Sequence, residues 1–186
     1  MTLERLINGC GAIAVNGDTS IDITCVCQDS RKVVPGAVFV AVKGFASDGH
    51  SYIASVLEKG AAAIIYEDAA AAAEQVEKSG RHDAVMVQVE SSRHALAIIS
   101  ANFYDNPSHK LNLVGITGTN GKTTTVTLLY RMFTALGYNC GLLSTIANYV
   151  GSKGSEAVNT TSDPLTINSL LSEMVDAGCE YCFMEV

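Results

Sequence analysis

The sequence predicts an α/β protein made of two units, and three observations lead to this prediction. Short apolar runs alternate with helix-like segments between residues 12 and 90. A glycine-rich stretch at residues 117–121 joins an apolar run to a segment of helical period. The breaker cluster Asp105-Asn-Pro-Ser108 separates these two regions. Strands that alternate with helices are typical of a sheet covered by helices.

The first region, residues 1–107, is predicted to be a small α/β domain. Its helices are expected at residues 50–59, 68–79 and 92–103, from apolar residues at helical spacing or from alanine content. His50 is interpreted as a residue that begins the first of these helices. Strands are expected at residues 11–15, 23–27, 38–42, 62–66 and 84–89.

The second region, residues 108–186, is predicted to begin a parallel-sheet mononucleotide-binding domain. A strand at 111–116 precedes a helix that runs to Leu136, with a buried stripe formed by Val126, Leu129, Phe133 and Leu136. A hairpin is expected at 145–158, a helix after Asp163-Pro164, and a strand at 181–186. Few strands follow the boundary, so we expect a truncated sheet and a chain that is a fragment.

The motif Val114-Gly-Ile-Thr-Gly-Thr-Asn-Gly-Lys-Thr-Thr-Thr125 indicates a phosphate-binding loop. A turn between a strand and a helix directs backbone N–H groups and the helix dipole at an anion. Lys122 would reach the β- and γ-phosphate oxygens of a nucleotide, and the Thr123 hydroxyl would bind Mg²⁺. The glycine spacing departs from the strict P-loop pattern, and a chance Gly-Lys-Thr is the alternative. The rest of the expected cradle is Gly118, Thr119, Asn120, Gly121 and Thr124.

Composition narrows the class of protein further. Hydrophobic residues make up 48% of the 186 residues and charged residues 17%, which is typical of a globular chain. The net charge of −7 and the lack of a basic cluster disfavour nucleic-acid binding. No apolar run is long enough for a membrane span, so we expect a cytoplasmic protein. We also expect the protein to be a monomer. The six cysteines are then expected to be reduced core thiols, because Cys179-x-x-Cys182 lacks a second metal-binding pair.

Several segments together resemble the Mur ligase family, in the same order along the chain. The segment Thr117-Gly-Thr-Asn-Gly-Lys-Thr-Thr124 is similar to the phosphate loop of that family, which accounts for its unusual spacing. Asp29-Ser-Arg31 and Lys43-Gly-Phe-Ala-Ser-Asp-Gly-His50 resemble its N-terminal uridine-nucleotide module. Asn159-Thr-Thr-Ser-Asp-Pro164 and Phe183-Met-Glu-Val186 resemble the branch that adds a diamino acid to UDP-N-acetylmuramoyl-L-Ala-D-Glu.

This resemblance assigns roles to individual residues. It implies that Ser30, with Phe45, Ala46 and Ser47, contacts the uridine nucleotide, and that Asn159, Thr160 and Thr161 orient the muramoyl-dipeptide. It implies that Glu185 is a Mg²⁺ ligand and that Lys122 is catalytic. Taken alone, Ser30 is a turn hydroxyl, Glu185 a solvated strand end and residues 159–161 a polar loop.

The reaction implied by the resemblance is ATP-driven amide formation in peptidoglycan synthesis. Phosphorylation of a substrate carboxylate gives an acyl phosphate, which the amine of meso-diaminopimelate or L-lysine attacks. The protein would contribute positioning and charge neutralisation. As a fragment, this chain is expected to lack ligase activity by itself.

Three alternatives remain at the level of sequence. One is another Mur-like ligase, of the folylpolyglutamate or cyanophycin type. A P-loop kinase or GTPase is the second, and guanine selectivity would favour it. The third is a non-catalytic UDP-sugar-binding module formed by the N-terminal domain.

Overall fold

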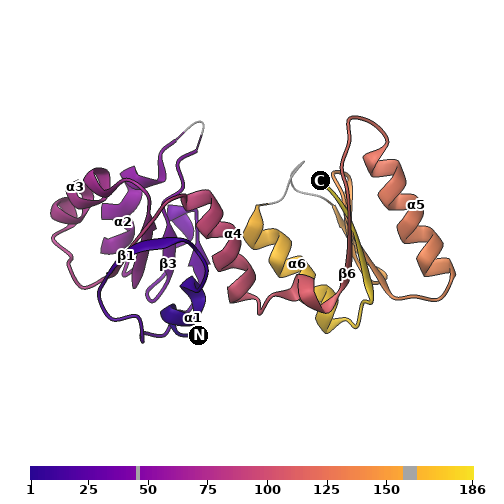
Figure 1. Ribbon diagram of the computed structural model, residues 1–186, viewed down its shortest axis with the longest axis horizontal. Coiled ribbons are helices and arrows are strands. Elements are labelled where there is room, and N and C mark those ends of the chain that lie inside the picture. The colour runs from indigo at the N-terminus through magenta and orange to yellow at the C-terminus, as the bar shows by residue number, and fades with distance from the viewer. Residues whose placement is uncertain (45–46, 157–162) are drawn as a thin grey trace. The chain divides into compact units, whose positions relative to one another are not determined.

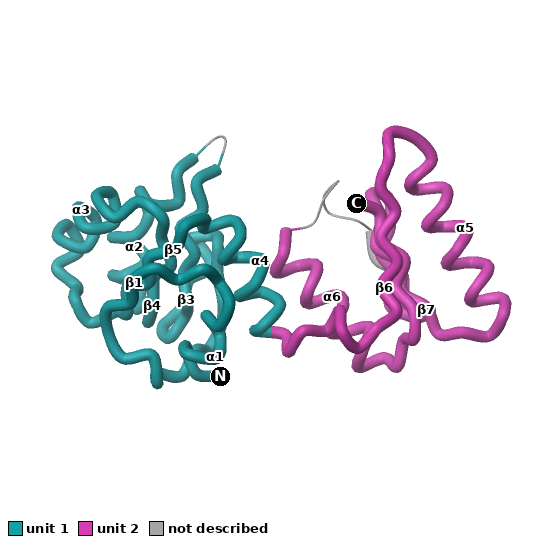
Figure 2. The backbone as a smooth tube through the Cα atoms, in the orientation of Figure 1, with its two compact units in different colours: residues 1–103 teal, residues 104–186 magenta. Residues whose placement is uncertain are grey.

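The computed structural model describes residues 1–44, 47–156 and 163–186 of the chain. It divides into two compact units, Met1–Phe103 (unit 1) and Tyr104–Val186 (unit 2), shown in Figure 2. Each unit has its own sheet and its own helices. The predicted α/β class is confirmed.

Unit 1 alternates strands and helices along the chain. Its elements are α1 (Leu3–Ile7), β1 (Ala12–Asn16), β2 (Val26–Cys27), the 3-10 turn η1 (Ser30–Lys32), β3 (Val38–Val40), the 3-10 turn η2 (Gly49–Tyr52), α2 (Ile53–Glu58), β4 (Ala63–Tyr66), α3 (Ala69–Ser79), β5 (Val85–Val89) and α4 (Ser92–Phe103). The strand order is β1-β5-β4-β3-β2. Strands β2 to β5 pair in parallel, whereas β1 pairs antiparallel with β5.

Helices cover both faces of the unit 1 sheet, with α2 and α3 on one face and α4 on the other (Figure 1). Phe39 and Ile64 pack in one cluster with Ile53, Val56 and Leu57 of α2. Successive residues of a strand point to opposite faces of the sheet, so the residues next to Phe39 and Ile64 in β3 and β4 face α4. Ile53, Val56 and Leu57 are all buried, which confirms the helical spacing of apolar residues from which this helix was predicted.

Unit 2 contains a second sheet, of strand order β6-β10-β7-β8-β9. Strands β6, β10 and β7 are parallel neighbours, and β8 and β9 extend the sheet as an antiparallel hairpin. The elements are the 3-10 turn η3 (Pro107–Lys110), β6 (Asn112–Ile116), α5 (Lys122–Ala135), β7 (Cys140–Leu143), β8 (Ala147–Val150), β9 (Lys153–Glu156), α6 (Pro164–Asp176) and β10 (Tyr181–Glu185).

The helices α5 and α6 lie on opposite faces of this sheet (Figure 1). Phe183 of β10 packs with Val126 of α5 and Leu142 of β7. Cys182, its neighbour in β10, packs on the other face with Leu171 and Met174 of α6. Strand β10 is thus covered on both sides, and its position in the sheet is fixed by two separate cores.

Several expectations from the sequence were wrong in detail. Of the stripe predicted to be buried in α5, only Val126 is buried; Leu129 and Phe133 are half-buried, and Leu136 at the C-cap is 68% exposed. The helix expected from residue 50 begins with the 3-10 turn η2 and becomes α-helical only at Ile53. Helix α1 and strand β7 were not predicted, because both are short and α1 has only two buried residues.

The cysteines are all free thiols, and all except Cys25 are buried. Burial raises the pKa of Cys182 to about 12, with smaller contributions from the neighbouring Cys179 and Cys140. A thiol with so high a pKa forms little reactive thiolate. Within the described ranges, none of the helices combines the length and hydropathy needed to cross a bilayer.

We predict that Phe183→Ala destabilises the chain by about 3–5 kcal/mol, because truncation of a buried aromatic side chain leaves a cavity. Phe183 is 1% exposed, whereas Leu136 of the same unit is 68% exposed. Leu136→Ala should therefore change the stability by at most about 0.5 kcal/mol. Urea unfolding followed by circular dichroism measures both variants. Equal losses for the two variants would contradict the described core.

Candidate functional site

The loop predicted to bind phosphate, residues 117–121 of unit 2, connects the end of β6 to the first turn of α5. Gly121, the N-cap of α5, has a φ of 79°, and Gly118 has a φ of 145°. Residues with a side chain rarely adopt such angles, which explains glycine at both positions. No side chain caps the helix, so the N–H groups of its first turn remain available to an anion.

The Lys122 ammonium lies over this loop and donates a hydrogen bond to the Gly118 carbonyl at 2.8 Å. The structure therefore brings Lys122 together with the predicted loop residues. Thr119, Asn120, Gly121 and Thr124 are exposed around the same turn. One flexible cation next to several backbone donors is an arrangement suited to a polyphosphate.

Thr123 and Glu185 meet at the edge of the sheet where parallel strands end. The Thr123 hydroxyl donates to Glu185 Oε2 at 2.9 Å, although the two residues are 62 positions apart. The backbone N–H and hydroxyl of Thr145, which follows β7, donate to the same oxygen at 3.3 and 3.2 Å. Three segments of the chain thus converge on one carboxylate.

These contacts keep Glu185 ionised. Desolvation alone would raise its pKa, but the hydrogen bonds from Thr123 and Thr145 and the charge of Lys122 outweigh desolvation. The pKa of Glu185 is therefore lowered from its ordinary value. A negatively charged carboxylate next to a hydroxyl is the donor set that a hard cation prefers.

Thr123 and Glu185 are the residues that would hold a Mg²⁺ ion at this edge, where the ion would supply positive charge for bound phosphates.

A second candidate site is a cavity of about 560 Å³ in unit 1. It lies where β2 and β3 end, at the edge where open parallel sheets bind ligands. Ser30 and Ser47, both predicted to contact a uridine nucleotide, line the same cavity. The complete lining is Gln28, Asp29, Ser30, Arg31, Val42, Gly44, Ser47, Gly49 and Tyr52.

The Ser30 wall of this cavity is held by two charged side chains. Arg31 Nε and Nη2 donate to the Asp29 carboxylate at 2.9 and 2.8 Å, and these bonds hold the Asp29 pKa well below its usual range. Lys59, at the end of α2, donates to the Ser30 carbonyl at 2.6 Å. The backbone of the turn is thereby fixed, while the Ser30 hydroxyl has no part in these bonds.

Five predicted site residues lie outside the described residues. These are Phe45 and Ala46 in unit 1 and Asn159, Thr160 and Thr161 in unit 2. Sequence reasoning also missed Thr145, Tyr52 and Lys59. Tyr52 and Lys59 carry no motif, and the place of Thr145 depends on β7, which was not predicted.

Comparison with known proteins identifies the family. Residues 22–104 match a family model described as the Mur ligase family catalytic domain, and residues 116–186 match one described as the Mur ligase middle domain. The chain belongs to the Mur ligase family.

Curated relatives narrow the comparison to one branch of the family. The chain is 52% identical to the UDP-N-acetylmuramoyl-L-alanyl-D-glutamate--2,6-diaminopimelate ligase of Cytophaga hutchinsonii and 40% identical to that of Clostridium perfringens. Both alignments cover 100% of this chain but only 37% of the relative. The chain therefore spans somewhat more than a third of the length of these Mur ligases.

Solved structures share the fold. The structure of a UDP-N-acetylmuramoyl-L-alanyl-D-glutamate--2,6-diaminopimelate ligase aligns with a TM-score of 0.76 at 19% identity, over 100% of this chain and 36% of the other. The MurF ligase of Thermotoga maritima in complex with ADP aligns with a TM-score of 0.53 at 30% identity. That alignment covers 86% of this Mur ligase chain and 31% of the other.

We predict that Thr123→Val and Thr145→Val each raise the pKa of Glu185 toward its ordinary value of 4.5, because each removes a hydroxyl donor to the carboxylate. Thr124→Val is the matched control, since Thr124 is exposed. Carboxyl ¹³C chemical shifts followed against pH report the Glu185 titration directly. An unchanged titration in both variants would show that these hydroxyls do not hold the carboxylate.

Proposed function

We propose that this chain carries the uridine-nucleotide site and the ATP site of a Mur ligase that adds a diamino acid to UDP-N-acetylmuramoyl-L-Ala-D-Glu. The observation that carries the proposal is the presence of two built sites, one in each unit. Ser30 and Ser47 line a cavity in unit 1, and Lys122, Thr123 and Glu185 gather at the sheet edge of unit 2. The names of the curated relatives support the same substrate.

The ATP site would use the residues of the phosphate loop. Backbone N–H groups at residues 118–124 and the Lys122 ammonium would hold the phosphates, and Thr123 with Glu185 would hold Mg²⁺. The similar MurF ligase of Thermotoga maritima was solved in complex with ADP, which supports nucleotide binding by this chain. Bound ATP would supply the phosphoryl group that activates the substrate carboxylate for amide formation.

The residues of this chain contribute charge neutralisation and orientation to that reaction. Two anions, a carboxylate and a triphosphate, must approach each other, and Lys122 lowers the repulsion between them. Glu185 stays ionised through its three hydrogen bonds and so remains able to bind a cation. The proposal also includes the substrate contacts implied by the family resemblance: the uridine nucleotide for Phe45 and Ala46, and the muramoyl-dipeptide for Asn159, Thr160 and Thr161.

A Mur-like ligase of another substrate class is the nearest competing function. We expect the chain to bind UDP-N-acetylmuramoyl-L-Ala-D-Glu more tightly than UDP-N-acetylglucosamine in a calorimetric titration, with no binding of a folate-type substrate. Ser30→Ala should weaken the binding of both UDP ligands about tenfold, since the loss of a hydrogen bond to the ligand costs on the order of 1 kcal/mol or more. Ser20→Ala, at an exposed turn in the same unit, is the control.

The outcome of this titration separates the possibilities. Selective binding that depends on Ser30 supports the proposed substrate. Equal binding of both UDP ligands would limit the site to the uridine nucleotide. No binding by a chain that circular dichroism shows to be folded would overturn the proposal for unit 1.

Lys122→Ala is predicted to weaken binding of Mg²⁺-ATP at least about tenfold, because it removes the cation from the phosphate cradle. Binding of UDP ligands by unit 1 should not change. Lys153→Ala, an exposed lysine of the same unit, controls for a general loss of positive charge. The measurement is a titration of each variant with Mg²⁺-ATP and with Mg²⁺-GTP. Unaltered ATP affinity in Lys122→Ala, or a preference for GTP, would contradict the proposed site.

A further inference from the structure

His50 is almost completely buried, with 1% of its surface exposed, directly after the Ser47 and Gly49 wall of the unit 1 cavity. A buried imidazole must find partners for both ring nitrogens. His50 finds them in two different parts of unit 1. These partners connect the wall of the cavity to the junction between β4 and α3.

The hydrogen bonds of His50 define its tautomer. Nε2 accepts from the backbone N–H groups of Glu67 and Asp68, both at 3.2 Å. An N–H group can only donate, so Nε2 carries no hydrogen. Nδ1 must then carry the proton and donate to Asp48 Oδ1 at 2.6 Å. The ring is neutral and oriented by three hydrogen bonds.

On the cavity side, His50 bonds to Asp48, which lies between the cavity-lining residues Ser47 and Gly49. Asp48 Oδ1 also accepts from the His50 backbone N–H at 3.0 Å. The loop of residues 42–49 is closed by Gly44 N–H to the Ser47 carbonyl and by Gly49 N–H to the Val42 carbonyl, each at 3.0 Å. Gly44, Ser47 and Gly49 line the cavity, so an altered position of Asp48 would move this wall.

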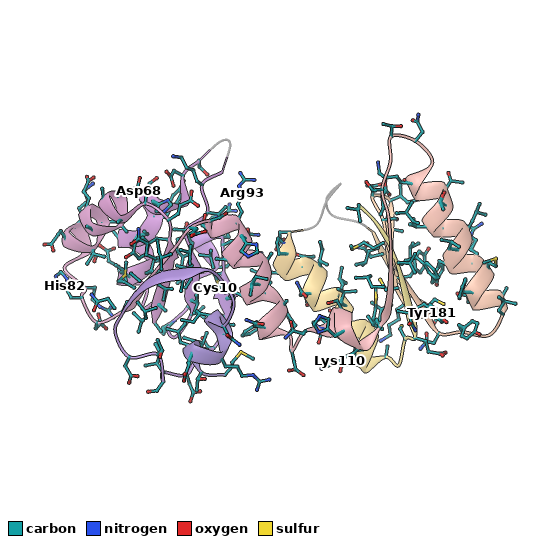
Figure 3. The ribbon with its side chains drawn as sticks, in the orientation of Figure 1. Cys10, Asp68, His82, Arg93, Lys110 and Tyr181 are labelled. Atoms are coloured by element: carbon teal, nitrogen blue, oxygen red, sulfur yellow. The ribbon has the colours of Figure 1, made fainter. Side chains whose placement is uncertain are left out.

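On its other side, the partners of His50 belong to the junction between β4 and α3. Asp68 is the N-cap of α3, and its carboxylate accepts from Ala71 N–H at 3.0 Å. The Glu67 carboxylate accepts from the Ser92 N–H and hydroxyl at 2.8 and 3.0 Å, which ties the junction to the start of α4. Arg93, in the first turn of α4, donates a hydrogen bond to the Lys43 carbonyl at 3.0 Å. Asp68 and Arg93 are labelled in Figure 3.

We propose that His50 is a positioning residue that fixes the Gly44, Ser47 and Gly49 wall of the unit 1 cavity for the uridine diphosphate group of the substrate. This inference rests on the proposed function of unit 1. Its role is indirect, because the buried ring contacts the wall through Asp48 and the loop backbone rather than the ligand. An apolar replacement would fill the space but would leave the Glu67 and Asp68 N–H groups without their acceptor.

The tautomer can be tested on the unaltered chain. Two-bond ¹H–¹⁵N correlation spectra distinguish a protonated from an unprotonated ring nitrogen. We expect Nδ1 protonated and Nε2 unprotonated. A protonated Nε2 would overturn the inference, because it cannot accept from Glu67 and Asp68.

Two variants separate the contributions of the ring nitrogens. His50→Asn retains a donor near Asp48 but does not reach the junction, whereas His50→Gln can place an acceptor near Glu67 and Asp68. We expect His50→Asn to weaken UDP binding about tenfold, through the loss of two hydrogen bonds, and His50→Gln to stay within about threefold of the unaltered chain. His82→Asn, an exposed histidine of the same unit labelled in Figure 3, is the matched control.

Hydrogen exchange without ligand provides an independent readout. The amides of Gly44 and Gly49 should exchange at least about tenfold faster in His50→Asn, while the amide of Ile64 in β4 should not change. If His50→Asn binds UDP as the unaltered chain does and its loop amides exchange at the same rate, the inference is wrong. If the unaltered chain binds no uridine nucleotide, the proposed function of unit 1 fails and this inference fails with it.

Discussion

The parallel pairing of β6, β10 and β7 is the constraint on which the phosphate-loop site depends. The register places Glu185 beside Ile116, the last residue before the loop, and Met184 beside Leu143. Parallel strands end at the same edge, so the residues that follow β6 and β7 necessarily meet the end of β10. A shift of one residue would turn Glu185 to the opposite face and separate it from Thr123. The two cores on either side of β10 hold this register, because Phe183 and Cys182 must each remain buried.

The site of unit 1 is built in a different way. Among the described residues, side-chain hydrogen bonds to the backbone lie beside its walls. Lys59 donates to the Ser30 carbonyl from 29 residues away. We infer that His50, bonded to Asp48 and to the Glu67 and Asp68 N–H groups, holds the opposite wall. Unit 2 thus positions its groups by strand register, whereas unit 1 positions them by side-chain contacts to the backbone.

Local features of this Mur ligase chain could be predicted from its sequence, and long-range ones could not. The strand, turn and helix that carry Lys122 were predictable because the apolar run, the glycines and the helical segment are contiguous. Thr145 was missed because only the pairing of β7 with β10 brings it to Glu185. Leu136 was predicted to be buried because helical periodicity indicates the side of a helix but not the residue at which its packing ends. The partners of His50 are backbone N–H groups, which leave no signal in a residue pattern.

The charge of the chain limits how its two sites can recognise anions. The net charge of this chain is −7, so its overall charge gives no long-range attraction for the UDP-sugar and the triphosphate that we propose as ligands. The cations near the sites are few, and Arg31 and Lys59 are already engaged in holding the Ser30 turn. Recognition must therefore come mainly from short-range donors, namely loop N–H groups, hydroxyls and Lys122, rather than from a broad positive field. Such donors act over one hydrogen-bond length, so their geometry matters more than their number. For the function we propose, the residues that orient these sites, Glu185 with its threonines and His50 with Asp48, matter as much as the residues that face the ligands.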